Sequence, residues 1–314
     1  MKKEFKVFYS IAFVIFSIFI ASRAMSDIDA GSHVLNASMQ FISCQTDFAV
    51  GLGNSFLTNI PNGTYSNAIS TNITALQSDR TQLQSYADSG NVSAFRTYVF
   101  YNYSADFIKL TVSFLRDAIG QKATVLNKIR TNYSSLQATY QNCSFTAVKT
   151  AALLKVDSYE QIIANYQQKI NNISTKINDT SSLTQILSDA NSTIIQPLQS
   201  AINAANNFTS LRAAFQSYCL FNGCVNGTNF HLAAKFNLAR LQLILNYIKT
   251  TSPYSNQTDK ISQAQSYLDA SSSALVTTGA LTYSGNESSD VWSNQFAAGA
   301  VMKTILTSTT RSIY

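Results

Sequence analysis

The chain has 314 residues, of which 46% are apolar, so it has ample material for a packed core. Only 12% are charged, against about 25% in a typical soluble protein, and the formal net charge is +6. The basic residues are scattered, and no cluster of Lys and Arg with interleaved aromatic residues occurs. Composition therefore argues against nucleic-acid binding.

The first 24 residues join a basic start to an apolar stretch. Three lysines lie within the first six residues, residues 7–21 are apolar or small, and Ser22-Arg23-Ala24 follows. This order is typical of a secretory signal peptide, residues 1–24. The alternative is an uncleaved anchor, since the uncharged run would span ~24 Å of a ~30 Å hydrocarbon core as a helix. Both interpretations place residues 25–314 outside the cell or on its surface, with membrane contact only through the N-terminal segment if it is uncleaved.

Apolar residues recur at alternating spacings of three and four in three segments, residues 69–87, 108–147 and 159–177. From Ile108 to Ala147 the spacing predicts one long helix with a buried seam, interrupted only by Lys122. Further amphipathic helices are predicted at residues 183–218 (kinked at Pro197), 230–249, 260–275 and 291–307.

Few breakers interrupt these segments, because neither Gly nor Pro occurs between Gly120 and Pro197. Capping boxes are predicted at 157–160 (Asp-Ser-Tyr-Glu) and 182–185 (Ser-Leu-Thr-Gln), each starting a helix. The predicted fold class is all-α: an elongated antiparallel helical bundle, coiled-coil-like, forming an ectodomain with disulfides. Residues 25–314 form this helical domain, and a division into two sub-bundles is predicted near residues 150–157.

The pattern Asn-x-Ser/Thr, the acceptor for N-glycosylation, is strongly over-represented. It occurs at 14 of the 27 asparagines, whereas a 70-in-314 chance of Ser or Thr at each second position predicts about 6. A Ser/Thr/Asn-rich composition alone therefore accounts for fewer than half. The predicted acceptors are Asn36, Asn62, Asn72, Asn91, Asn102, Asn132, Asn142, Asn172, Asn178, Asn191, Asn207, Asn226, Asn256 and Asn286.

The four cysteines are predicted to form disulfides, because an exported chain meets an oxidising environment. Of three possible connectivities, we expect Cys219 with Cys224, which closes a local turn, and Cys44 with Cys143, which ties an N-terminal helix to the central one. Zinc ligation is the alternative, but only two histidines and no C-x-x-C are present. A catalytic thiol with His231 as its base is a second alternative.

Motifs for catalysis or cofactor binding are absent from the sequence. No G-x-S-x-G, P-loop, G-x-G-x-x-G, H-E-x-x-H or EF-hand loop occurs, so we predict no catalytic residues, no metal site and no cofactor. Four aromatic residues between Tyr98 and Tyr103, beside the Asn102 acceptor, are expected at the core or its rim.

An export signal, dense acceptors, few charges and heptad helices together resemble surface proteins of microbes with glycosylated envelopes, archaea in particular. This resemblance carries no diagnostic motif and no site residues. The expected function is a structural or adhesive role at the cell surface, without catalytic activity. The alternative is an extracellular ligand-binding or sensory helical ectodomain. The expected partners are other cell-envelope proteins or further copies of the chain, bound through helical faces.

Overall fold

The computed structural model describes residues 32–119, 121–219, 228–229, 231–252, 254–277 and 286–310. This part of the chain is helical apart from one two-residue parallel pair, β1 (Tyr218–Cys219) with β2 (Thr228–Asn229). The prediction of an all-α fold class is confirmed. The chain divides into two compact units, Met1–Leu154 and Lys155–Tyr314.

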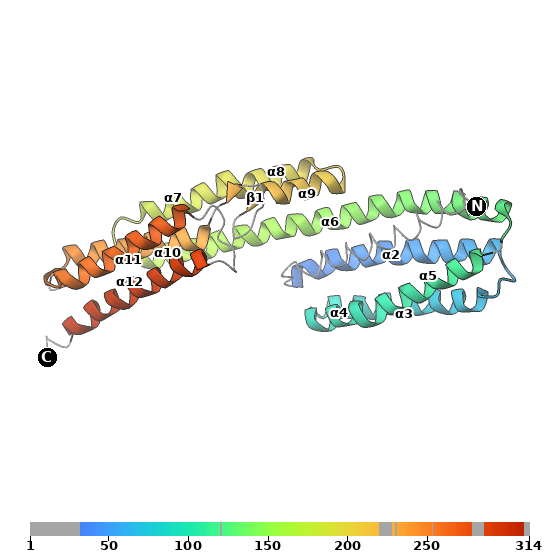
Figure 1. Cartoon of the computed structure of the whole chain (residues 1–314), viewed down its shortest axis with the longest axis horizontal. Coiled ribbons are helices and arrows are strands. Elements are labelled where there is room, and N and C mark those ends of the chain that lie inside the picture. The colour runs from blue at the N-terminus through green and yellow to red at the C-terminus, as the bar shows by residue number, and fades with distance from the viewer. Residues whose placement is uncertain are drawn as a thin grey trace. The chain divides into compact units, whose positions relative to one another are not determined.

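The first unit contains five α-helices in its described part, with a π-helical turn η1 (Val99–Tyr103) before α5 (Figure 1). They are α2 (Ser32–Asn59), α3 (Ser66–Asp88), α4 (Val92–Tyr98), α5 (Ser104–Ala118) and the first part of α6 (Ala123–Ser174).

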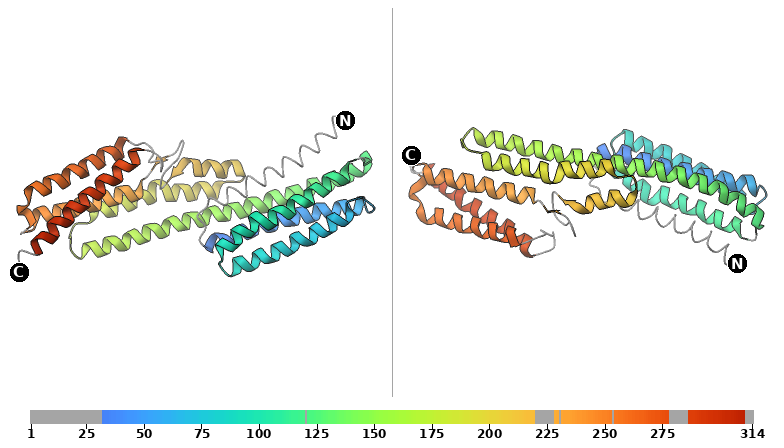
Figure 2. Two further views of the ribbon diagram at one scale, coloured as in Figure 1. Left: turned by 60° about the horizontal axis from the view of Figure 1, so that its bottom comes forward. Right: turned by 90° about the horizontal axis from the view of Figure 1, so that it is seen from above.

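The second unit contains the end of α6 and the remaining described elements, among which α10, α11 and α12 lie side by side (Figures 1 and 2). They are α7 (Ser181–Ala190), η2 (Asn191–Ile195, π-helical), α8 (Gln196–Ala204), α9 (Phe208–Ser217), the β1–β2 pair, α10 (Leu232–Thr250), η3 (Tyr254–Asn256), α11 (Thr258–Thr277) and α12 (Asn286–Thr310).

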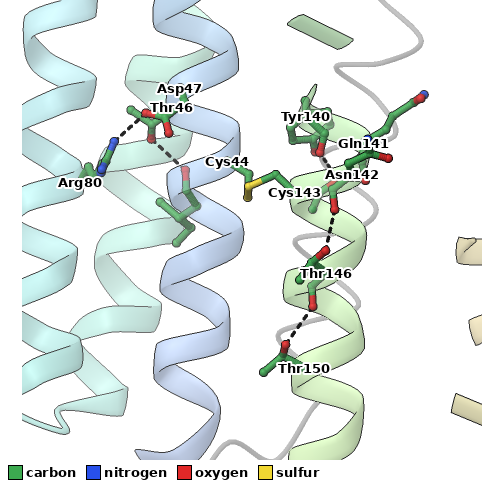
Figure 3. Close-up of a disulfide and its surroundings, with 12 residues drawn as sticks. Cys44, Thr46, Asp47, Arg80, Tyr140, Gln141, Asn142, Cys143, Thr146 and Thr150 are labelled. Carbon is green, nitrogen blue, oxygen red and sulfur yellow. Dashed lines mark hydrogen bonds and ion pairs between the residues drawn. A yellow bond between two sulfur atoms is a disulfide. The ribbon is translucent and has the colours of Figure 1, made fainter. Parts of the chain in front are cut away.

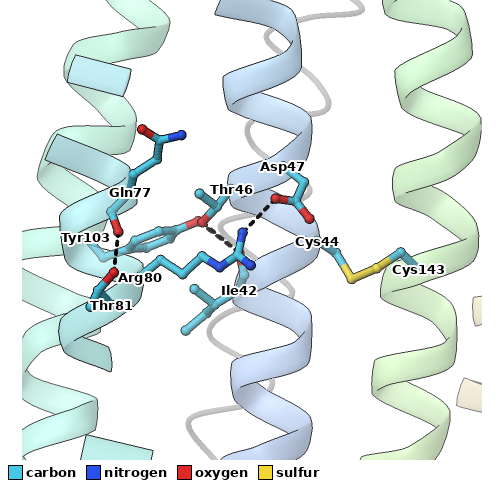
Figure 4. Close-up of polar contacts among 9 residues, drawn as sticks. All are labelled: Ile42, Cys44, Thr46, Asp47, Gln77, Arg80, Thr81, Tyr103 and Cys143. Carbon is cyan, nitrogen blue, oxygen red and sulfur yellow. Dashed lines mark hydrogen bonds and ion pairs between the residues drawn. A yellow bond between two sulfur atoms is a disulfide. The ribbon is translucent and has the colours of Figure 1, made fainter. Parts of the chain in front are cut away.

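Helix α2 is the central element of the first unit, lying between α3 and α6 (Figures 3 and 4). Two glycines allow neighbouring helices to approach it closely. A Cβ on Gly51 would lie 2.7 Å from Leu136 Cδ2 of α6, and one on Gly53 would lie 2.6 Å from Ile73 Cδ1 of α3. The predicted seam of α3 packs into this core, since its apolar residues from Ile69 to Ala87 are buried.

The predicted continuous helix over residues 108–147 is wrong in two respects. The chain leaves the helix at Ile119, whose ψ of 126° is extended, and α6 begins only at Ala123. In addition, the predicted seam of α5 is its outer face, with Ile108, Val112 and Ile119 exposed. A second apolar row is buried instead, because it is the one that faces α2 and α3: Tyr103, Phe107, Leu110 and Phe114.

The capping box predicted at residues 157–160 is also wrong, because α6 continues through it to Ser174. Ser158 Oγ instead donates to the carbonyl of Lys155 within the helix, at 2.6 Å. A capping pattern inside a helix does not interrupt it, because the turns on both sides already form favourable backbone hydrogen bonds. The box predicted at residues 182–185 is displaced as well: α7 begins at Ser181, with Thr180 as an N-cap that makes no side-chain hydrogen bond.

The predicted helix over residues 183–218 is interrupted twice. The π-helical turn η2 ends at Ile195, two residues before Pro197, and Gln196 N–H donates to the carbonyl of Asn191, five residues back. This wider turn accommodates the proline, whose ring would collide with the carbonyl four residues before it in a regular α-helix. The second interruption follows Ala205, whose ψ of 131° is extended, and α9 begins anew at Phe208.

Apolar faces of α10, α11 and α12 form a core in the second unit, which a buried amide secures. This core contains Leu241, Leu245, Ile248, Ile261, Ala264, Leu268, Ala298, Met302 and Ile305. Gln295 of α12 is 1% exposed, and its Nε2 donates to Ala234 O at 3.1 Å and to Ser271 Oγ at 3.2 Å. Its Oε1 accepts a 2.7 Å bond from Asn237 Nδ2, so one amide ties three helices together.

Candidate functional site

The predicted glycan acceptors lie on the surface wherever the structure describes their exposure. Ten are exposed: Asn36, Asn62, Asn91, Asn102, Asn132, Asn142, Asn172, Asn178, Asn207 and Asn256. Asn72 and Asn191 are half-buried, and none of these twelve is buried. Asn226 and the side chain of Asn286 lie outside the described residues. Asparagines without the pattern are exposed to a similar degree, so the excess of the triplets, rather than their exposure, distinguishes them.

Two acceptors also cap helices, and the two roles use different atoms. Asn91 Oδ1 accepts from Ala94 N at 3.0 Å at the start of α4, and Asn207 Oδ1 accepts from Ser210 N at 2.8 Å at the start of α9. An N-glycan is attached through Nδ2 and leaves Oδ1 available. The Asn207 cap is a full capping box, because Ser210 Oγ accepts in return from Asn207 N at 3.3 Å.

Two other acceptors use Nδ2 to contact a neighbouring helix. Asn132 Nδ2 donates to Ser55 Oγ of α2 at 3.0 Å, and Asn72 Nδ2 donates to Ser113 Oγ of α5 at 3.3 Å. An attached sugar would have to share this nitrogen with the existing bond and fit beside the neighbouring helix.

Cys44 of α2 and Cys143 of α6 form the predicted pair, a disulfide with a sequence separation of 99 (Figure 3). Cys44 is buried, and Phe48 one turn later packs its ring against Tyr140 at 5.3 Å between centroids. The predicted Cys219–Cys224 pair lies outside the described residues, apart from the backbone of Cys219 in β1.

Polar contacts also fasten α2 on its other side (Figure 4). Arg80 Nη1 of α3 lies 2.7 Å from Asp47 Oδ1, and Thr46 Oγ1 lies 3.1 Å from the hydroxyl of Tyr103. Burial raises the pKa of Tyr103 well above its usual range, so this hydroxyl stays protonated and hydrogen-bonded. Helix α2 is therefore fixed covalently to α6 and by polar contacts to its other neighbours.

Two carboxyl groups in the first unit, those of Asp79 and Asp117, are buried with one oxygen that has no hydrogen-bond partner. Asp79 of α3 is 5% exposed, and its Oδ1 accepts a 2.8 Å bond from the hydroxyl of Tyr98, whereas its Oδ2 has no partner. Burial raises the pKa of Asp79, and the nearby carboxyl of Asp106 raises it further, although the Tyr98 hydrogen bond lowers it. Burial and the bond to Asp79 raise the pKa of Tyr98 to about 12.

A shallow groove between α10 and α11 has a volume of about 370 Å³ and is lined by Lys249, Ile261, Ser262, Gln265, Ser266 and Asp269. Its polar groups are bonded to one another: Lys249 Nζ donates to Gln265 Oε1 at 2.8 Å, and Gln265 Nε2 donates to Asp269 Oδ1 at 2.9 Å. The groove therefore offers a ligand few polar groups that are not already paired.

Nowhere in the described part of the chain do three His, Cys, Asp or Glu side chains gather as a metal site would require. His231 is the N-cap residue of α10 and is buried, with burial and nearby Lys235 lowering its pKa. The side chains of Cys219 and Cys224, its proposed partners in a catalytic pair, lie outside the described residues. Within the described ranges no helix has the length and hydropathy needed to cross a bilayer. The predicted signal peptide or anchor, residues 1–24, lies outside them.

No protein family, no curated protein and no solved structure matches this chain.

Sequence reasoning did not identify the Asn91 and Asn207 caps or the buried Asp79 carboxyl. The signal for Asn207 was present, because Ser210 occupies the third helical position after it, but the usual capping-box pattern has Glu or Gln there. Asp79 gave no signal, since a polar residue in a helix is ordinarily expected at the surface.

Proposed function

We propose that this chain is an exported, N-glycosylated helical protein of the cell surface with a structural or adhesive role. Its extracellular part would be an elongated antiparallel bundle, coiled-coil-like, stabilised by disulfides. Its partners would be other envelope proteins or further copies of itself, bound through helical faces.

The observation that carries this proposal is the excess of glycan acceptors, 14 where composition predicts about 6. None of the twelve whose exposure is described is buried, so an enzyme could reach the folded chain at these positions. The surface is poor in charge, with 12% charged residues, and attached glycans would supply the hydration that charges provide elsewhere.

The construction of the first unit supports a role outside the cell. A disulfide between α2 and α6 stabilises a chain where the environment is oxidising. Buried polar contacts between Tyr103 and α2, on the other side of that helix, further favour a single packing arrangement, which suits a protein that bears load or presents a surface.

Labelling of intact cells with a membrane-impermeant, amine-reactive biotin tests the location. Lys128, Lys176 and Lys303 are exposed, so the protein should be labelled without lysis while a cytoplasmic marker stays unlabelled. Labelling that requires lysis would contradict the proposal.

A further inference from the structure

Exposed apolar side chains are concentrated in one short segment of the first unit. Of eight large apolar residues exposed in the described part of the chain, five lie between residues 100 and 119. They are Phe100, Tyr101, Ile108, Val112 and Ile119, with Tyr101 at 68% and Ile119 at 70% exposure. Contiguous apolar groups on a surface mark sites that bind another molecule.

A heptad pattern runs through this segment. Ala105, Ile108, Val112 and Leu115 of α5 are spaced alternately by three and four residues. Tyr101, in the π-helical turn η1, and Ile119, where the chain leaves the helix, continue this spacing beyond its two ends, and we name the row of six residues the outer seam. The buried row from Tyr103 to Phe114 lies on a different face of the same helix. Such spacing along a helix matches the seam that packs against another helix, rather than against a flat surface or a small molecule.

One flank of the outer seam is basic. Lys109 and Arg116 follow Ile108 and Leu115 by one residue each, seven residues or ~10.5 Å apart along the helix. Lys109 Nζ contacts Asp106 Oδ1 at 2.6 Å, which leaves two of its three N–H donors available, and its side chain is 64% exposed. Arg116 stacks on the ring of Tyr65 at 5.4 Å, which fixes its position and leaves its edge free to bind a carboxylate.

A second copy of the chain fits this face poorly. Two outer seams packed together would place Lys109 and Arg116 opposite each other or opposite the neutral flank of Ser104, Thr111 and Ala118, so no opposite-charge pair would form. Each copy also carries a net charge of +6. Acidic residues of a partner would pair with Lys109 and Arg116, whereas the flanks of a second copy of this chain offer them no carboxylate.

We infer that the outer seam of α5 is a docking surface for a helix of another protein, one with an apolar heptad seam and acidic residues one heptad apart along its flank. No glycan acceptor lies on α5 itself; the Asn102 acceptor adjoins its N-terminal end, and Asn72 of α3 contacts it at Ser113, which belongs to neither the outer seam nor its basic flank. This inference deepens the proposed adhesive role and rests on it for the biological setting. The binding chemistry is independent of where the protein resides.

Fluorescence anisotropy with two synthetic peptides tests it on the purified full chain. Both peptides are amphipathic helices of three heptads with the same Leu and Ile seam, and they differ only in Glu or Lys at the flanking positions. The Glu peptide should bind at least tenfold more tightly than the Lys peptide. Ile108→Gln with Ile119→Gln should weaken Glu-peptide binding at least tenfold, and Lys109→Glu with Arg116→Glu should reverse the preference.

Phe296→Gln is the matched control, because Phe296 is 74% exposed on α12 and should leave binding unchanged. Four results would overturn the inference: no binding of either peptide, equal binding of both, binding insensitive to the seam variants, or unfolding of the Ile108→Gln/Ile119→Gln protein. A doubling of mass in light scattering that Ile108→Gln abolishes would also overturn it, in favour of a second copy. None of these outcomes bears on cell-surface labelling, so failure here is distinguishable from failure of the proposed function.

Discussion

Two residues, Asn207 and Asp79, have structural roles that the sequence pattern does not reveal. Asn207 is at once a glycan acceptor by pattern and the N-cap of α9, because the cap uses Oδ1 and the sugar would use Nδ2. Asp79 is a buried carboxyl that Tyr98 only partly satisfies. For each residue, a substitution tests the structural role that the contacts assign to it.

Removal of the Asn207 cap should cost stability even where no glycan is present. In protein made without glycosylation, Asn207→Ala should lower the free energy of unfolding by about 1 kcal/mol, because a first-turn N–H loses its acceptor. Thr209→Ala destroys the same acceptor pattern but leaves the cap. Asn207→Asp also removes the acceptor and preserves the cap. Urea unfolding that finds Asn207→Ala and Thr209→Ala equally stable would contradict the assigned cap.

Replacement of Asp79 by Asn should make the protein less sensitive to pH. The unfolded carboxyl titrates near 3.8 and the folded one above it, so between these values the folded chain retains a proton that the unfolded chain has lost. The stability contribution is therefore present below the unfolded pKa and is lost as pH rises through the folded pKa. Asp79→Asn should raise the melting temperature at pH 7 and flatten its decline above pH 4. An unchanged pH profile would show that Asp79 ionises in the fold as freely as in the unfolded chain.

At the scale of elements, α3 and α5 differ in how well the sequence predicts which face of the helix is buried. The apolar row of α3 was predictable because it repeats without competition from Ile69 to Ala87. Helix α5 was not, since it carries two heptad rows, and Asp117 interrupts the one that is buried. Sequence periodicity finds both rows, but only the positions of α2 and α3 decide between them.

Neighbouring residues of α5 test which row is buried. Leu110 is 1% exposed, so Leu110→Ala should lower the free energy of unfolding by about 2–5 kcal/mol through the cavity that it leaves. Ile108 is 44% exposed, and Ile108→Ala should change it by no more than about 0.5 kcal/mol. Denaturant unfolding in which the order is reversed would restore the row from Ile108 to Ile119 as the buried one.

Considered as a whole molecule, the chain was predictable in fold class, while its helix boundaries were less so. Heptad repeats and scarce breakers indicated an all-α fold, and the acceptor pattern needs no structure to be counted. The continuation of α6 through residues 157–160 was not predictable, because the capping pattern there is local and competes with backbone bonds that it does not reveal. The Cys44–Cys143 pair was expected from the number and positions of the cysteines, and the packing of α2 against α6 brings the two residues together.

Loss of the Cys44–Cys143 link should destabilise the protein strongly. A closed loop of about 100 residues removes roughly 4.7 kcal/mol of unfolded-state entropy in the loop-entropy relation, which is an upper value for the measured effect. Cys44→Ala with Cys143→Ala should therefore shift the urea midpoint downward, and reductant should shift the wild-type protein in the same direction. A wild-type midpoint that does not respond to reductant would show that this pair contributes nothing to stability.

Site-resolved mass spectrometry of glycopeptides from the native protein tests export and glycosylation most directly. Enzymatic release of N-glycans in H₂¹⁸O converts each occupied Asn to labelled Asp, so occupancy is read at every acceptor. The account predicts sugar at several of the exposed positions, with Asn172 and Asn178 among them, and lower occupancy at Asn72 and Asn132, where Nδ2 contacts a neighbouring helix. All fourteen acceptors bare, in cells whose other surface proteins are glycosylated, would contradict it.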